Sequence, residues 1–365
     1  MSLIPEGDPV ASRRLSQAEL VASVSPDAPD SDVDSVIVDP RRAGAATLEF
    51  ARSVALGLSD TPPWLHSRFL YDDIGSRLFE EICEQPEYYL TRTEAGILEQ
   101  CASRIREATG PVTLIELGSG NSGKTDYLLA AYAATEPSVR YVPIDVSAGI
   151  LNQAKDAISV RHPTVTVTGV ADTYERAFPL FKEFSPAMVL FLGSSIGNFD
   201  QRESDVFWQG VSDALSPRDF VLLGVDLVKE ESLFNAAYND AAGVTAQFTK
   251  NLFARINREL GAGIDLDAVE HVAQYNSEWQ RVEIYARFLS RQDVYLEPLD
   301  RTIVVPKRTM VMTEISRKYD LEKMKEYLRC YDFAVREVFT DKKRWFGLLL
   351  LQRLPQMPRK SADQR

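Results

Sequence analysis

The chain has 365 residues, 45% of them hydrophobic, which is enough to bury a substantial core. Its 41 lysines and arginines are outnumbered by 53 aspartates and glutamates, and the resulting formal net charge of -12 argues against nucleic acid and anionic membranes as partners. The sequence contains neither a secretory signal segment nor a run of about eighteen apolar residues. We therefore expect a soluble cytoplasmic protein, by default a monomer, that acts on a small molecule.

The cysteines and histidines are scattered along the chain, at Cys83, Cys101, Cys330, His66, His162 and His271. They form no C-x-x-C pair and no cluster with the spacing of metal ligands. The sequence therefore predicts reduced thiols and no metal site.

The first part of the chain carries helical signals only. Residues 1–40 are rich in proline, serine and aspartate and predict a disordered extension, because they contain too little apolar surface to offset the entropy of ordering. An apolar helical period follows over residues 44–58, and short helical pieces interrupted by Pro86 continue to about residue 105. We predict no strand in this part.

Strands and helices alternate from residue 112 onward. Apolar runs predict strands at 112–117, 140–146, 164–171, 187–194 and 219–227, with helical segments between them, two of which are 123–134 and 147–160. This rhythm predicts a mainly parallel sheet with right-handed crossovers.

The rhythm stops after Asp226, and residues 229–313 read as an insertion. The insertion contains a long helical stretch at 234–260, followed by alternating strand-like segments at 279–291 and 293–310. The chain then returns to a helix at 321–331 and to two apolar runs, 333–340 and 345–354, which predict a final antiparallel hairpin.

The decapeptide ELGSGNSGKT at residues 116–125 is compatible with two kinds of ligand. From Gly118 it matches the phosphate-loop pattern G-x-x-x-x-G-K-[ST], with Lys124 and Thr125 in the required places. It also fits the glycine turn that follows the first strand of a doubly wound sheet and cradles an adenosine cofactor.

Acidic residues follow three of the predicted strands, at the sheet edge where open α/β sheets bind ligands. Asp145 can accept hydrogen bonds from both ribose hydroxyls, and Asp172 from an adenine amino group. If a triphosphate were bound, the repulsion between the Glu116 carboxylate and each phosphate charge would cost about 3 kcal/mol, at a distance of about 6 Å and an effective dielectric of about 20. Glu116 would instead attract the sulfonium and ammonium of S-adenosylmethionine, whose carboxylate Lys124 would hold. A phosphate-loop ATPase, with Asp226 binding magnesium, remains the alternative.

Several long motifs extend beyond this loop, among them YDDIGSRLFEEICEQPEYYLTRTE, LIELGSGNSGKT, FLGSSIGNF, AYNDAAGVTAQF and TEISRKY. With them the sequence resembles the histidine-specific Nα-methyltransferases of ergothioneine biosynthesis, from about residue 66 to residue 352. The resemblance implies trimethylation of the α-amine of L-histidine to histidine betaine (hercynine), with S-adenosylmethionine as methyl donor.

The resemblance also implies an α/β fold. Its core would be the Rossmann-like sheet of a class I S-adenosylmethionine-dependent methyltransferase, ending in a C-terminal antiparallel hairpin, with an interleaved α+β substrate-binding domain. The substrate-binding domain would comprise residues 41–92 and 229–318, and the methyltransferase domain residues 93–228 and 319–355, with residues 356–365 as a tail.

Site residues follow from the resemblance position by position. The implied cofactor contacts are Gly118, Lys124, Asp145, Asp172 and Thr173. The implied substrate contacts are Tyr88, Asn198 and Tyr238 at the amino-acid head and Glu314 with Ser316 at the imidazole. The resemblance places Tyr71 and the carbonyl of Gly193 at the reacting amine.

The chemistry of these residue types agrees with such roles. Asn198 and Tyr238 are neutral donors suited to a carboxylate. Glu314 lies between apolar residues in a strand-like segment, so an inward carboxylate needs a donor, which an imidazole N–H can supply. Two further alternatives stay open: a methyltransferase for another aromatic amino acid such as a tryptophan derivative, and a cofactor-binding module without catalysis.

Overall fold

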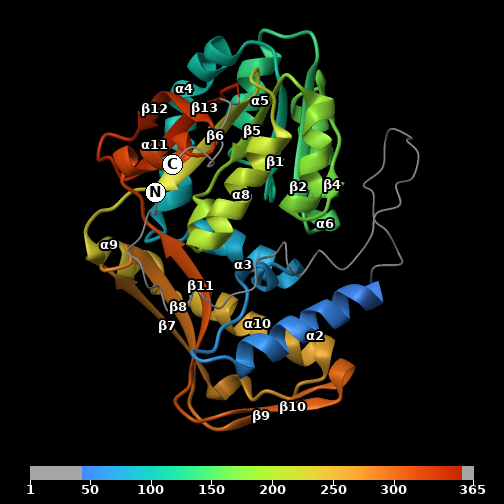
Figure 1. Cartoon of the computed structure of the whole chain (residues 1–365), viewed down its shortest axis with the longest axis vertical. Helices are drawn as coiled ribbons and strands as arrows, with labels where there is room; N and C mark the ends of the chain where they lie inside the picture. Colours follow the sequence, from blue (N-terminus) through green and yellow to red (C-terminus); the bar gives the residue numbers. More distant parts are fainter. Residues whose placement is uncertain (1–42, 356–365) are drawn as a thin grey trace, which may run out of the picture.

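The computed structural model describes residues 43–355. The predicted extension at residues 1–40 and the predicted tail at 356–365 lie outside the described residues. The described chain forms two parts, a large sheet flanked by helices in the upper half of Figure 1 and a smaller α+β part below it.

The large sheet has eight strands in the order β12-β13-β6-β5-β1-β2-β3, with β4 also paired to β2. Its parallel members are β1 (Thr113–Leu117), β2 (Val139–Asp145), β3 (Val165–Val167), β4 (Val170–Ala171), β5 (Ala187–Phe191) and β6 (Phe220–Asp226). The C-terminal hairpin of β12 (Phe333–Thr340) and β13 (Phe346–Arg353) adds through an antiparallel pairing of β13 with β6. This is the Rossmann-like sheet with a C-terminal hairpin that the sequence predicts.

The central strands are buried on both faces, which explains their continuous apolar runs. Successive residues of β1 enter different cores, Leu114 on one side and Ile115 on the other. The helices of this part are α4 (Tyr89–Thr109), α5 (Asp126–Ala133), α6 (Ala148–Arg161), α7 (Tyr174–Ala177), α8 (Gln201–Ala214) and α11 (Leu321–Arg329), with the 3-10 segments η3 (Phe178–Phe184) and η4 (Ser195–Asn198).

The smaller part is built around a three-stranded antiparallel sheet in the order β11-β8-β7 and a separate hairpin, β9 with β10. These strands are β7 (Val269–Asn276), β8 (Arg281–Phe288), β9 (Gln292–Leu296), β10 (Arg301–Val305) and β11 (Met310–Arg317). Its helices are α2 (Ala43–Ser59), α3 (Asp73–Glu84), α9 (Glu231–Ala237) and α10 (Val244–Leu260), with η2 (Ser67–Leu70), η5 (Leu266–Ala268) and η6 (Glu297–Leu299).

Strand β11 brings the two parts together. A bridge between Trp64 and Met312 ties the segment after α2 to β11, and a bridge between Leu227 and Tyr319 ties the end of β6 to the residues after β11. Gly197 of η4 packs on the backbone of Arg317, which leaves little room for a side chain at residue 197. The carboxyl edge of the large sheet therefore faces β11.

Some sequence predictions differ from the structure, and one strand was missed. The helix predicted at 234–260 is two helices, because Asp240 caps the amides of Val244 and Thr245 and Gly243 adopts a φ of +73°. The strand predicted at 164–171 is interrupted between β3 and β4. The strand predicted at 187–194 ends at Phe191, before a turn. Strand β7 was not predicted, because polar residues interrupt the alternation of apolar and polar positions that indicates a strand.

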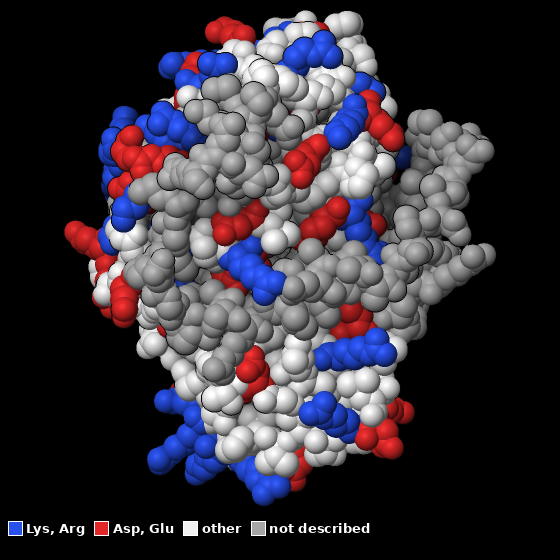
Figure 2. All heavy atoms as spheres, viewed as in Figure 1, with Lys and Arg blue, Asp and Glu red and all other residues white. Residues whose placement is uncertain are grey.

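The surface gives no sign of a single dominant charge on the side that can be seen. Figure 2 shows acidic and basic side chains interspersed over the face it displays. No helix among residues 43–355 combines the length and the apolar character needed to cross a membrane.

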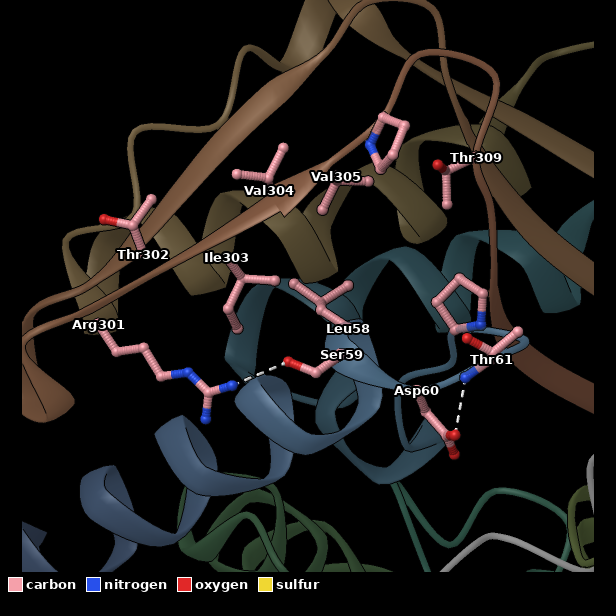
Figure 3. Close-up of a pocket in the computed structure, with 12 residues that line it drawn as sticks. Leu58, Ser59, Asp60, Thr61, Arg301, Thr302, Ile303, Val304, Val305 and Thr309 are labelled. Carbon is pink, nitrogen blue, oxygen red and sulfur yellow. Dashed lines mark hydrogen bonds between the residues drawn. The ribbon is translucent and has the colours of Figure 1, made fainter.

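A hollow of about 480 Å³ lies between the end of α2 and β10, in the smaller part (Figure 3). Its polar groups are partly engaged with one another, since Arg301 donates to Ser59 at 3.3 Å and the amide of Thr61 donates to Asp60 at 2.7 Å. None of the described residues that line it is a predicted site residue.

Candidate active site

The turn after β1 is shaped by glycines. Gly118 and Gly120 adopt φ values of +66° and +50°, where glycine carries no steric cost. The amide of Gly118 donates to the carbonyl of Ile144 at 2.8 Å, which joins the turn to β2. A methyl group at Gly118 would lie 2.6 Å from the hydroxyl of Tyr174, so the turn and the start of α7 are in close contact.

The two side chains that define a phosphate loop are both engaged by carboxylates. Lys124 forms an ion pair with Glu94, which is fully buried. The hydroxyl of Thr125 donates to Glu116 at 2.6 Å. In a phosphate loop the lysine holds the phosphates and the hydroxyl holds magnesium, so this arrangement argues against the ATPase alternative.

Glu116 lies under the glycine turn instead of facing an open ligand site. Its carboxylate is buried and accepts hydrogen bonds from Thr125 and Tyr141. The pKa of Glu116 is raised to about 7, because the effect of burial exceeds the lowering effect of these two hydrogen bonds. The carboxylate is thus engaged with partners inside the protein, and the attraction of Glu116 for the cofactor cation stays a prediction.

Two of the predicted cofactor acids line the same edge of the sheet. Asp145 ends β2 and accepts the amides of Gly120 at 3.1 Å and Ser147 at 3.0 Å, while burial raises its pKa. Asp172 follows β4 and accepts the amide of Thr173 at 2.9 Å, just before α7. Three strand ends thus lie around the start of α7, and they carry Gly118, Asp145 and the Asp172–Thr173 pair.

A left-handed turn follows β5. Gly193 and Ser194 adopt φ values of +72° and +58° in succession. The amide of Gly193 donates to both oxygens of Glu94 at 2.9 Å, and the hydroxyl of Ser194 accepts the amide of Asp226 at 3.0 Å. The turn at Gly193 and Ser194 is therefore held by contacts from helix α4 on one side and strand β6 on the other.

Glu94 connects this turn to the glycine loop, since the same carboxylate receives Lys124 and the Gly193 amide. It reaches that position because Gly224 of β6 has no side chain, and a methyl group there would lie 2.2 Å from a Glu94 oxygen. Sequence reasoning missed Glu94, because no local spacing signals a contact across 99 residues.

Glu314 and Asn198 meet at the junction of the two parts. The amide of Asn198 donates to Glu314 at 3.0 Å, from η4 to β11. The pKa of Glu314 is raised to about 7. Burial raises this pKa, and the charge of Lys318 and the Asn198 hydrogen bond offset part of the increase. A carboxylate so placed can hold a donor such as a ring N–H.

Tyr238, Ser316 and Tyr88 form a second group beside this pair. The hydroxyls of Tyr238 and Ser316 are 2.7 Å apart, and the ring of Tyr88 packs edge to face on Tyr238 with centroids 6.1 Å apart. Tyr238 ends α9 and Tyr88 caps α4, so both positions are fixed by helix ends.

Tyr71 lies in an aromatic environment, with its ring edge to face on Phe79 and Phe248 at centroid distances of 5.6 and 5.4 Å. Its backbone precedes Asp72, which caps α3 at the amide of Gly75. Burial, with a further contribution from the charge of Glu314, holds the pKa of Tyr71 well above its usual range. Tyr71 is therefore a neutral phenol, suited to hydrogen bonding more than to proton abstraction.

A buried charged group lies directly behind Tyr238. Asp226 accepts Lys318 at 2.9 Å and also pairs with Lys229, and the hydroxyl of Tyr89 lies 2.8 Å from it. Lys318 in turn donates to the hydroxyl of Tyr238 at 3.0 Å. Since two lysines occupy Asp226, the suggested magnesium role of this residue is not supported by its surroundings.

The structure thus brings the predicted residues together at one junction. One side has glycine turns and acids suited to an adenosine cofactor, and the other has an acid, an amide and hydroxyls suited to a polar small molecule. Among residues 43–355, no group of three or more His, Cys, Asp or Glu side chains is arranged to hold a metal ion.

Comparison with known proteins adds independent information. A family profile described as "Histidine-specific methyltransferase, SAM-dependent" matches residues 50–353. The chain is 40% identical over 311 residues to a histidine N-alpha-methyltransferase of Mycolicibacterium smegmatis, covering 85% of this chain and 97% of that protein.

Two more distant relatives carry different names. The chain is 30% identical over 252 residues to ergothioneine biosynthesis protein 1 of Schizosaccharomyces pombe, covering 66% of this chain and 31% of that protein. It is 29% identical over 299 residues to a 4-dimethylallyltryptophan N-methyltransferase of Claviceps purpurea, covering 74% of this chain and 86% of that protein.

Proposed function

The chain belongs to the family of histidine-specific, S-adenosylmethionine-dependent methyltransferases, and on that premise we propose that it trimethylates the α-amine of L-histidine. The product would be histidine betaine (hercynine), the first intermediate of ergothioneine biosynthesis. The relatives named for histidine methylation and for ergothioneine biosynthesis support this proposal over a tryptophan derivative, whose methyltransferase relative is less similar.

The observation that carries the proposal is the hydrogen bond between Asn198 and Glu314, at the junction between η4 and β11. It sets an acid with a pKa near neutrality beside neutral donors. A substrate with a carboxylate at one end and a ring N–H at the other matches this set. An indole has one ring N–H and no basic ring nitrogen, so it makes less use of Glu314 together with Ser316.

We assign the cofactor side to the turn after β1 and to the acids at the strand ends. Gly118 gives the cofactor close access to backbone, Asp145 accepts from the ribose hydroxyls, and Asp172 with Thr173 lies toward the adenine. Lys124 is the cation for the cofactor carboxylate. Because it already pairs with Glu94, it would bridge the two carboxylates.

The bound cofactor supplies a methyl group on a sulfonium, which an amine attacks in line. The protein's own contribution is orientation and exclusion of water, and the amine releases a proton to solvent before each attack. Asn198 and Tyr238 hold the carboxylate of the amino acid. Tyr71 and the carbonyl of Gly193 orient the amine, so that a lone pair of the neutral form points at the donor. After three transfers no lone pair remains.

The division into domains belongs to this proposal. Residues 41–92 and 229–318 would carry the substrate, and residues 93–228 and 319–355 the cofactor. The boundary between residues 92 and 93 falls inside α4, which is continuous. A rigid helix at this boundary favours a fixed relation of the two sides. Action as a monomer in the cytoplasm is also proposed, and size-exclusion chromatography with light scattering tests the oligomeric state.

The direct test is incubation of the purified chain with S-adenosylmethionine and L-histidine, followed by mass spectrometry. We expect products heavier by one, two and three methyl groups, with the trimethylated form accumulating. Histidine that stays unmodified, under conditions where the cofactor is bound, would refute the proposed function.

A further inference from the structure

Glu94 is a buried carboxylate outside the proposed cofactor and substrate contacts. It lies on α4, its side chain is fully buried, and it forms an ion pair with Lys124. The amide of Gly193 donates to both of its oxygens at 2.9 Å. Since a buried charge is stable only when it is paired and hydrogen-bonded, these two partners fix the position of the carboxylate.

The two partners of Glu94 lie next to each other. A methyl group at Gly193 would lie 3.2 Å from the ammonium nitrogen of Lys124, so this ammonium packs against the turn after β5. The fold makes room for the acid, because Gly224 of β6 has no side chain and a methyl group there would overlap a Glu94 oxygen. One carboxylate from α4 therefore anchors both the glycine loop after β1 and the turn after β5.

We propose that Glu94 is a positioning residue that holds the cofactor carboxylate, through Lys124, and the substrate amine, through the Gly193 turn, in one geometry for methyl transfer. This inference rests on the proposed function, which assigns one ligand to each of these two partners. An in-line displacement slows steeply when its two reactants are slightly misplaced. A single anchor for both ligand sites therefore contributes more to the rate of transfer than to the binding of either ligand.

The charge of Glu94 also acts on Lys124. Burial lowers the pKa of Lys124, but the charge of Glu94 and the hydrogen bond to it raise this pKa, and the net shift is upward. Cys83 of α3 and Glu116 of β1 face the same ammonium and raise its pKa to a smaller extent. Without the Glu94 charge, these smaller effects oppose the burial, so the pKa of Lys124 should fall. The lysine would then lose its proton, and with it the hold on the cofactor carboxylate, at a lower pH.

The test is Glu94→Gln, which keeps the shape and one oxygen of the side chain and removes its charge. The first readout is the single-turnover rate of methyl transfer to histidine, with both ligands saturating. We expect this rate to fall by at least about tenfold, as for loss of a hydrogen bond to a charged group. The calorimetric Kd values for histidine and for S-adenosylhomocysteine, the demethylated cofactor, should stay within about threefold of wild type at neutral pH.

The second readout separates this role from a merely structural one. The Kd of S-adenosylhomocysteine is measured for Glu94→Gln and for wild type from about pH 7 to about pH 9.5, below the ordinary lysine pKa of about 10.4. We expect the ratio of the two Kd values to rise by at least about threefold over this range, because the variant loses the charge of Lys124 first. In a Lys124→Met background, adding Glu94→Gln should give a ratio that does not change with pH. A merely structural loss would weaken binding equally at every pH.

Gly224→Ala provides an independent variant, with Gly347→Ala as matched control. The two glycines lie in the neighbouring strands β6 and β13, but only at residue 224 would a methyl group meet Glu94. We expect Gly224→Ala to lower the single-turnover rate by at least about tenfold, and Gly347→Ala to leave it within about twofold of wild type. Thermal melting shows whether each variant is folded.

Several outcomes would overturn the inference. One is an unchanged single-turnover rate in Glu94→Gln. Others are a Kd ratio that does not change with pH, or equal losses of rate in Gly224→Ala and Gly347→Ala. If Glu94→Gln does not fold, the comparison of the two glycine variants decides. Failure of the proposed function is distinguishable, because then the wild type itself would not methylate histidine, whereas the binding of S-adenosylhomocysteine is measured without histidine.

Discussion

Replacing Glu314 by alanine tests the pocket that selects the substrate. The carboxylate accepts the Asn198 amide at 3.0 Å, and we propose that it also accepts a ring N–H of histidine. A hydrogen bond to a charged group contributes about 1.5–3 kcal/mol, which corresponds to a loss of about 10- to 150-fold in kcat/KM for histidine. Cofactor binding should not change.

The effect on discrimination should be larger than the effect on histidine alone. In the wild type, a side chain without a ring N–H leaves Glu314 unpaired, and a site of this kind rejects such analogues by a factor on the order of 10⁴. Glu314→Ala removes that penalty, so leucine should gain while histidine loses. Glu314→Gln keeps an oxygen for Asn198 and separates the loss of charge from the loss of that contact.

The pH dependence gives a second check on the same residue. Because the pKa of Glu314 is raised to about 7, the fraction that is ionised in the free enzyme increases as the pH rises through neutrality. The ratio of kcat/KM for wild type to that for Glu314→Gln should therefore rise between pH 6 and pH 8 (roughly one unit on either side of this pKa). The assay is steady-state competition between histidine and leucine with mass-spectrometric detection. A Glu314→Ala variant that still discriminates histidine as strongly as wild type refutes this reasoning.

The cofactor side can be tested at Asp145, Glu116 and Gly118. Asp145→Ala should weaken S-adenosylmethionine binding by on the order of 100-fold through loss of the ribose contacts, with little change in Tm; unchanged affinity by calorimetry contradicts the ribose role. For Glu116, a pKa raised from 4.5 to about 7 means that the folded state holds the proton more tightly, so the free energy of unfolding should fall as the pH rises from 4.5 to 7. Glu116 alone should lower the free energy of unfolding by about 3 kcal/mol over this pH range. Urea denaturation of wild type and Glu116→Gln at both ends of that window measures it, and equal pH slopes would count against it. Gly118→Ala should destabilise the fold and impair cofactor binding more than Gly110→Ala, since both glycines have positive φ but only at Gly118 would the methyl group meet Tyr174, at 2.6 Å. Equal thermal shifts and equal affinities would show that this contact is unimportant.

The sheet could be predicted from the sequence because its strands are buried on both faces and read as uninterrupted apolar runs. The same reasoning failed where polar residues decide the structure. At residues 238–243 the signals of a helix break, Asp240 and Gly243, lie within an otherwise helical period. In β7 the residues are only partly buried, so no strict alternation remains.

The site could be predicted only through long motifs shared with a family. Asn198 and Glu314 are separated by 116 positions, and a single sequence contains nothing that pairs them. The buried ion pairs of Glu94 with Lys124 and of Asp226 with Lys318 were missed for the same reason. They join helix α4, the glycine loop, β6 and the end of β11, and no helical or strand spacing connects these segments.

Specificity for histidine is tested most directly by a competition among substrates. The chain is incubated with S-adenosylmethionine carrying a deuterated methyl group and an equimolar pool of the twenty common amino acids, and every labelled product is identified by mass spectrometry. We expect label in histidine alone, in up to three methyl groups on the α-nitrogen. Label on another amino acid instead of histidine, or on the imidazole ring, would contradict it.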